Sequence, residues 1–280
     1  MMLGVFLMLV AALCNATASV LQRRQAKEQT SGFSLSMIVD LARRPLWILG
    51  IATMIVGFVL HAVAISVSRI ALVQPLLITE LPFTLLLASW AFRLRIPRHD
   101  WTAIVLASAG LAVFLACLSP EGGDPRASGG AWALGVCVTL VPILVLVVLG
   151  YRGRREHRAA LLGIATGAAF GLNSAFIAGI GASVANGGGL LSTWQTYGVV
   201  VLGPASFFLL QNSLQAGNLV ASQPGFTLTN PLVSVAWGLA VFGERGYTGP
   251  WLVGSVAGAL MIAAGTVLLS RSDLLHPDRG

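Results

Sequence analysis

The chain has 280 residues, of which 56% are hydrophobic and only 10% are charged. A soluble domain usually carries about 25% charged residues, so the composition excludes an ordinary water-soluble protein and indicates that lipid covers much of the surface. The net charge of +7 is typical of nucleic-acid binding. However, the basic residues lie between apolar runs and form no stripe, so nucleic acid is not an expected partner.

Nine apolar segments approach the length of about 20 residues that a membrane helix needs. In chain order they cover residues 2–22, 46–68, 70–92, 101–118, 130–150, 159–183, 194–216, 218–242 and 250–270. The first resembles a signal peptide, but no Lys or Arg precedes it, so we expect a retained helix. Tryptophans near several segment starts, such as Trp101, Trp132, Trp194 and Trp251, are predicted interfacial anchors. The predicted fold class is all-α, a polytopic integral membrane protein.

Basic residues divide unevenly between the two sides that nine spans define. Fourteen lie on one side, whereas only Arg69, Arg126 and Arg245 lie on the other. Loops rich in Lys and Arg stay in the cytoplasm. We therefore expect a multi-pass protein of the cell membrane, with its N-terminus outside and its C-terminus in the cytoplasm.

An internal repeat divides the chain. Residues 73–84 (VQPLLITELPFT) align with 222–233 (SQPGFTLTNPLV), so that Gln74-Pro75 matches Gln223-Pro224 and Pro82 matches Pro231. This predicts a first four-helix unit over 1–120, a linking helix with its loops over 121–157, and a second four-helix unit over 158–280. The units start five spans apart, so they face opposite ways. Inverted repeats are typical of secondary transporters, although a duplication can also persist because its packing works.

Glu80 is predicted near the middle of the third span and is the only acidic residue expected inside a span. A carboxylate there costs about 2.5–3.5 kcal/mol and usually faces a cavity or a partner. Prolines bracket both Glu80 and its repeat mate Thr229, and each proline frees a backbone carbonyl. We therefore expect irregular backbone in both units, with Thr229 or Asn230 across from Glu80 at the interface of the two units. A carboxylate beside freed carbonyls suits a cation or a proton.

Other polar residues in the spans keep two interpretations each. Glu80 is either a proton or cation site or a protonated structural group, and His61 is either a proton relay or a packed side chain. Asn15 and Asn173 occupy comparable positions in the two units, as ligand contacts or as interhelical hydrogen-bonding groups. The residues predicted to bind substrate or ion are Glu80, Thr79, Thr229, Asn230, Asn15, Asn173, His61, Gln74 and Gln223. No metal ligand is assigned.

Several short motifs resemble a known family. The run Phe242-Gly243-Glu244-Arg245 before a glycine-rich last span is similar to the closing motif of the drug/metabolite transporter superfamily, of the EamA-like type. Pro45-Leu46-Trp47, Gly57 and 71–76 (ALVQPL) resemble its NIPA-type magnesium-transporter branch. The resemblance extends over nearly the whole chain and implies transport. Phe58 stands where that branch has an acidic residue, and Arg93-Leu94-Arg95 stands where a Glu-Arg pair is expected.

These patterns predict a secondary transporter without ATP hydrolysis, which moves an organic metabolite or amphiphile by alternating access with proton or cation coupling. A divalent-cation transporter, a channel, and a membrane scaffold or lipid-binding protein are the alternatives. No enzymatic activity and no cofactor are expected, since no nucleophile-base pair or phosphate loop is present. The expected partners are a small solute or ion and the lipid bilayer. A second copy of the chain, forming a homodimer, is a further alternative.

Overall fold

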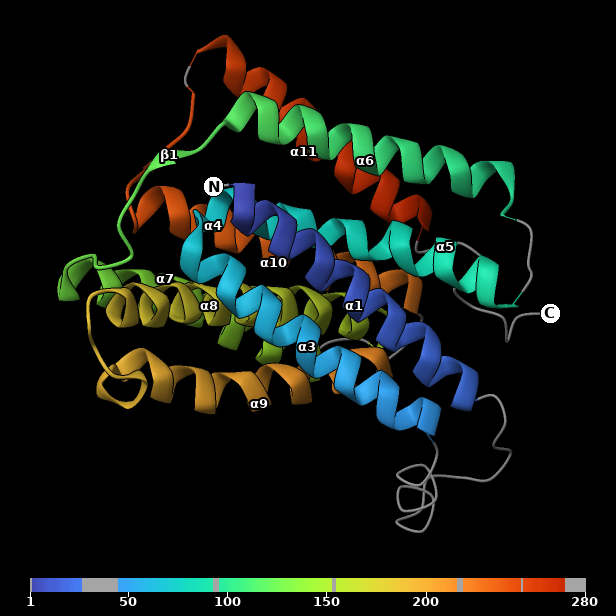
Figure 1. The fold of residues 1–280 in the computed structure, drawn as a ribbon, viewed down its shortest axis with the longest axis horizontal. Helices are drawn as coiled ribbons and strands as arrows, with labels where there is room; N and C mark the ends of the chain where they lie inside the picture. Colours follow the sequence, from blue (N-terminus) through green and yellow to red (C-terminus); the bar gives the residue numbers. More distant parts are fainter. Residues whose placement is uncertain are drawn as a thin grey trace.

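A computed structural model describes residues 2–26, 45–92, 96–152, 155–215, 219–247 and 249–269. In this part of the chain nearly all residues are helical (Figure 1). The helices are α1 (Met2–Ala26), α3 (Pro45–Val67), α4 (Ile70–Val73), η1 (Gln74–Thr79), α5 (Glu80–Phe92), α6 (Arg98–Leu118), α7 (Gly129–Arg152), α8 (Arg155–Ala185), η2 (Leu190–Ser192), α9 (Trp194–Gln215), α10 (Leu219–Ala240) and α11 (Pro250–Leu269). Two short strands, β1 (Glu121–Gly122) and β2 (Glu244–Arg245), were not predicted and pair antiparallel.

The chain is a helical membrane protein. Seven helical segments among the described residues are long and apolar enough to cross a bilayer, namely 2–21, 48–67, 70–91, 98–118, 129–152, 158–185 and 250–269. The apolar part of α9, Trp194–Leu210, is shorter. Large apolar side chains cover the outside, as on α7, where Leu134, Val138 and Leu144 are all exposed. Soluble proteins rarely show apolar surface of this extent, so lipid is the solvent of these faces.

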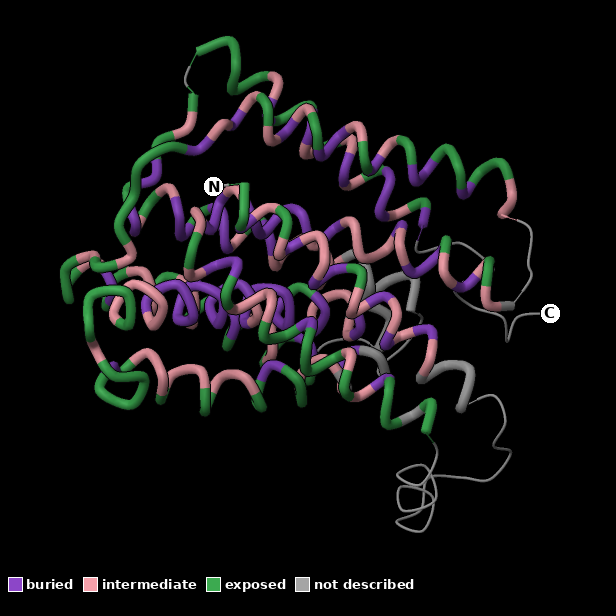
Figure 2. Tube along the Cα trace, viewed as in Figure 1, coloured by how far each residue is buried: buried purple, intermediate pink, exposed green. Residues whose placement is uncertain are grey.

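Helix α8 lies at the centre of the bundle. Most of its residues are buried, whereas α7 and α9 expose their outer faces (Figure 2). Helix α10 packs along α8, and Gly167 and Gly171 of α8 make this approach close. A methyl group at Gly167 would meet the Phe226 carbonyl at 2.6 Å, and one at Gly171 would meet the Asn230 carbonyl at 2.9 Å. The absence of a side chain at these two positions therefore allows α10 to approach α8 closely.

Helices α6 and α11 lie side by side at one edge of the bundle (Figure 1). Their backbones touch at glycines: a methyl group at Gly258 would lie 2.5 Å from the Phe114 nitrogen, and one at Gly110 would lie 2.9 Å from the Gly258 carbonyl. Lipid tails are as apolar as leucine, so helices in a membrane associate through such close packing of small residues.

The third predicted span is helical throughout but contains a 3-10 stretch, and it is called the broken helix below. It begins as α4, continues as the six-residue 3-10 helix η1 and returns to α-helix at Glu80. Runs of 3-10 helix longer than three or four residues are uncommon, and inside a helix they often mark a hinge. The irregular backbone predicted around Pro75 is therefore confirmed.

The same prediction for the second unit is wrong, because α10 continues as α-helix from Leu219 through Pro231 to Ala240. Its close packing along α8 favours a continuous helix there.

The tryptophans have two different environments. Trp101, Trp194 and Trp251 are about half exposed, as interfacial anchors should be. Trp132 is only 3% exposed, so its predicted anchor role is wrong. Its ring lies 5.2 Å from Trp194, 5.1 Å from Trp237 and 5.5 Å from Phe242, between ring centroids. These contacts attach the start of α7 to α9, α10 and the segment after it.

Replacement of Gly258 by alanine should destabilise the protein by about 1–3 kcal/mol, the usual cost of overpacking. The added methyl group must push α6 and α11 apart, since backbone atoms of α6 occupy its space. The measurement is the free energy of unfolding in mixed detergent micelles.

Gly130→Ala is the matched control. A methyl group at this helical position meets no atom within 4 Å, so it should leave stability unchanged or raise it by about 0.5–1 kcal/mol. Equal stability of the two variants would show that the contact between α6 and α11 has no energetic importance.

Candidate functional site

Asn15 and Glu80 meet between α1 and α5. The Asn15 side-chain amide on α1 is close enough to interact with the carboxyl group of Glu80, the first residue of α5. Gly57 on α3 makes room for this amide, because a methyl group there would lie 2.5 Å from Asn15 Oδ1. Asn15 therefore lies between α3 and Glu80, and Glu80 itself is half-buried.

His61 on α3 and Gln74 on η1 form a second polar pair. Their side chains are close enough to interact, and Gln74 is fully buried at the start of η1. Among the described residues, neither His61 Nε2 nor the two polar atoms of the Gln74 amide has a partner at hydrogen-bond geometry. Buried polar groups normally pair, so each such group needs an explanation, and a binding role is one.

The two pairs lie on the same elements. Gln74 and Glu80 are the first residue of η1 and the residue that follows its end, and His61 lies one helical turn after Gly57 on α3. A 3-10 helix rises about 2.0 Å per residue, so the six steps from Gln74 to Glu80 span about 12 Å. The pairs therefore form a polar column along the broken helix, which contacts both α1 and α10.

The residues predicted in the second unit contact helices α8 and α9. Thr229 packs on Gly167 of α8, and the Asn230 carbonyl packs on Gly171. Asn173 of α8 is buried and faces α9, where its Nδ2 lies 4.0 Å from the methyl position of Gly203. Within the described residues, Asn173 Oδ1 and Asn230 Oδ1 are buried without a hydrogen-bond partner.

Thr79 and Gln223 are the other residues predicted to bind substrate or ion. Thr79 bonds locally, since its hydroxyl donates to the Leu76 carbonyl at 2.6 Å. The side chain of Gln223 lies outside the described residues. An arrangement of Thr229 or Asn230 across from Glu80 stays a prediction, because the contacts described for both residues are with α8.

Two acidic residues were missed as buried groups. Asp100 is 0% exposed in the first turn of α6, with its carboxylate 3.1 Å from His99 Nε2. The expectation that Glu80 alone is a buried acid of the spans is therefore wrong, because α6 starts at Arg98, earlier than predicted. Glu244 belongs to the motif 242–245, which was used only for the family resemblance. It is 6% exposed. Both residues lie just outside the predicted spans 101–118 and 218–242, so the hydropathy pattern gave no sign of their burial.

Glu244, between α10 and α11, contacts the start of the broken helix. Its carboxylate accepts hydrogen bonds from the backbone amides of Ile70 at 2.9 Å and Ala71 at 3.1 Å. These amides have no partner inside a helix. The strand pair β1–β2 holds Glu244 opposite Gly122, and Arg69 Nε donates to the Gly122 carbonyl at 3.0 Å.

Charge and burial act against each other at Glu244, which lies outside the membrane-spanning helices. Burial raises the pKa of its carboxyl group, while the amides of Ala71 and Ile70 and the charge of Arg69 act to lower it. A polar pocket of about 360 Å³ opens beside it, lined in part by Ser66, Ser68 and Arg69. At the same end, a hydrogen bond and ion pair with Arg126 lower the pKa of Asp124.

No group of three or more His, Cys, Asp or Glu side chains that could hold a metal ion occurs within the described part of the chain. A preformed site that surrounds a divalent cation with several carboxylates therefore has no support there. The arrangement around Glu80 offers one carboxyl group and neutral amides, which suits a single positive charge or a proton.

Comparison with known proteins gives one informative relative. An uncharacterized protein of Corynebacterium glutamicum is 28% identical over 282 residues, which cover 98% of this chain and 96% of that protein. The similarity therefore extends over nearly the whole of both chains. No protein-family model matches the chain, and no solved structure matches it.

Replacement of Glu244 by alanine should cost about 1–3 kcal/mol, because two buried amide donors lose their acceptor. The free energy of unfolding in mixed micelles measures this loss. Glu121→Ala, at an exposed position of the paired strand, is the control and should change stability little. A Glu244→Ala protein as stable as this control would contradict the assigned role.

The stability of the protein should also depend on pH through Glu244. Because the pKa is raised by folding, the folded protein binds this proton more tightly than the unfolded chain does. The stabilisation is complete below the unfolded pKa near 4.5 and is lost as pH rises through the folded pKa. Unfolding measured over a pH series should show this loss in the wild type, whereas Glu244→Gln should have a flatter profile. Equal slopes would rule out titration of Glu244.

Proposed function

We propose that the protein is a secondary transporter that carries a small solute across the cell membrane by alternating access. The observation that carries this proposal is the polar column of Asn15, His61, Gln74 and Glu80 along a broken membrane helix. Polar side chains and irregular backbone are expensive at membrane depth. They are typical of places where a substrate or an ion passes.

The proposed architecture has nine spans in two inverted four-helix units. One similarity between the units supports it: Asn15 on the first helix faces Gly57 on the next, and Asn173 on α8 faces Gly203 on α9. The contact between α6 and α11 also supports it, because these are the last helices of the two proposed units. Helix α10 is less apolar than the seven segments but lies against α8, α11 and the broken helix, so it needs less contact with lipid.

Alternating access requires a contact between the units that can open. The broken helix provides it, since α4 and η1 contact α10 while Glu244 of the second unit binds the first amides of α4. In the proposed orientation this end is outside the cell, where Arg69, Arg126 and Arg245 lie. Release of Glu244 would free α4 and η1 to move relative to α10.

Glu80 is the proposed site of a proton or of a cationic group of the substrate. Its partner Asn15 is neutral, so nothing described beside it already compensates a negative charge. An organic metabolite or an amphiphile fits one carboxyl group among amides better than a divalent cation does. The resemblance to EamA-like members of the drug/metabolite transporter superfamily supports transport in general. In this proposal the protein has no catalytic role.

Glu80→Gln should abolish proton- or cation-coupled uptake in liposomes while folding stays intact, because the amide keeps the shape but neither ionises nor carries a proton. The assay screens metabolite mixtures and follows internal pH with a trapped fluorescent indicator. Glu121→Gln removes an acidic group from an exposed strand and should transport at the wild-type rate.

Wild-type uptake and pH dependence in Glu80→Gln would make Glu80 structural. The site would then have to be sought at His61, Asn15 and Asn173. Failure of every solute to move with the wild-type protein would favour the alternative of a membrane scaffold or lipid-binding protein.

A further inference from the structure

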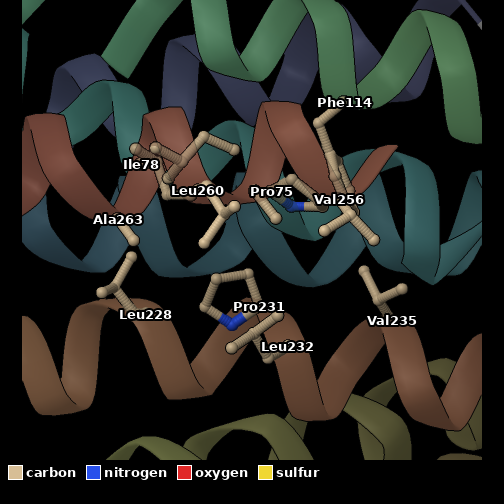
Figure 3. Close-up of a pocket in the computed structure, with 12 residues that line it drawn as sticks. Pro75, Ile78, Phe114, Leu228, Pro231, Leu232, Val235, Val256, Leu260 and Ala263 are labelled. Atoms are coloured by element: carbon tan, nitrogen blue, oxygen red, sulfur yellow. The ribbon is translucent and has the colours of Figure 1, made fainter. Parts of the chain in front are cut away.

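An apolar pocket of about 260 Å³ lies where η1 and α6 meet α10 and α11. Figure 3 shows Pro231 and Leu228 of α10 on one side, Leu260 and Ala263 of α11 on the other, and Pro75 at the far wall. All of its lining residues have hydrocarbon side chains. The pocket is separate from the polar column, although both include residues of η1.

The chemistry of the lining decides what can occupy this space. A buried water needs two to four polar partners, and these side chains offer none. A polar solute would lose its own hydrogen bonds on entering. Apolar cavities of about 150 Å³ already bind small hydrocarbons such as benzene. The larger volume here suits a segment of a hydrocarbon chain.

The pocket opens toward the bilayer. Leu232, Val256 and Leu260 at its rim are 56%, 53% and 65% exposed, whereas Ile78 on the inner wall is 3% exposed. The rim belongs to the same apolar surface that lipid covers on α11, where Val253 is also exposed. A molecule that reaches the pocket from this side therefore comes from the hydrocarbon of the membrane.

We propose that this pocket binds one hydrocarbon chain of an amphiphile that enters from the bilayer between α10 and α11. Its inner wall is formed by Pro75 and Ile78, and Ile78 is two residues before Glu80. Resting on the proposed function, this position makes an amphiphile the substrate class, with its chain in the pocket and its polar end toward the column. Occupancy would press on η1, the segment that links the two sites.

The test uses full-length protein in lipid nanodiscs and palmitic acid that carries a photoreactive diazirine in mid-chain. Peptide mapping should place cross-links on η1, α10 and α11, and excess unlabelled palmitic acid should remove them. Ala263→Phe fills the pocket and should abolish most of this labelling. Ala264→Phe is the matched control, since Ala264 is exposed on the same helix and does not line the pocket; it should label like the wild type.

Val235→Phe fills the pocket from α10 and keeps the test decisive if Ala263→Phe does not fold. Equal labelling of filled and control variants, or labelling of exposed α7 as strong as that of α10 and α11, would overturn the proposal. Labelling that excess palmitic acid does not displace would also overturn it, because a resident lipid would then hold the pocket. Cross-linking does not require transport, so loss of the proposed function alone would leave this result unchanged.

Discussion

A backbone amide or carbonyl in the hydrocarbon of a bilayer finds no water to bond, so each one needs a partner within the protein. A helix meets this requirement along its length, but its first amides have no partner inside the helix. At the start of α4 the partner comes from elsewhere in the chain. Glu244 accepts hydrogen bonds from the Ile70 and Ala71 amides. Because Glu244 lies between α10 and α11, this contact ties the start of the broken helix to a segment that is distant in sequence.

Close helix packing explains why a break is possible at all. Glycines bring α8 against α10 and α6 against α11 at backbone distance, and the 3-10 stretch contacts both α10 and α6. Between these helix pairs the packing is looser, and the apolar pocket lies there. A rigid frame around one irregular segment concentrates any movement in that segment. Such an arrangement would suit the proposed alternating access.

The polar residues around η1 are better explained by a binding site than by structural hydrogen bonds alone. Asn15 could serve as a simple interhelical bond, and Gly57 would then be only a packing glycine. That interpretation leaves His61 and Gln74 unexplained, because their buried polar atoms lack hydrogen-bond partners among the described residues. Groups left in this state cost free energy. A site whose occupant supplies the partners accounts for their presence better than structural bonding does.

The sequence alone determined the helical membrane class, because apolar runs of about 20 residues have no other stable form in a bilayer. It also located Glu80 and the proline-bracketed irregular backbone, since charge and proline act locally. It failed where burial depends on distant partners. The interhelical role of Glu244, the burial of Asp100 and of Trp132, and the continuity of α10 through Pro231 all depend on which helices lie alongside. Only the tertiary structure decided these features, because a residue's neighbours across helices are not recorded in its local pattern.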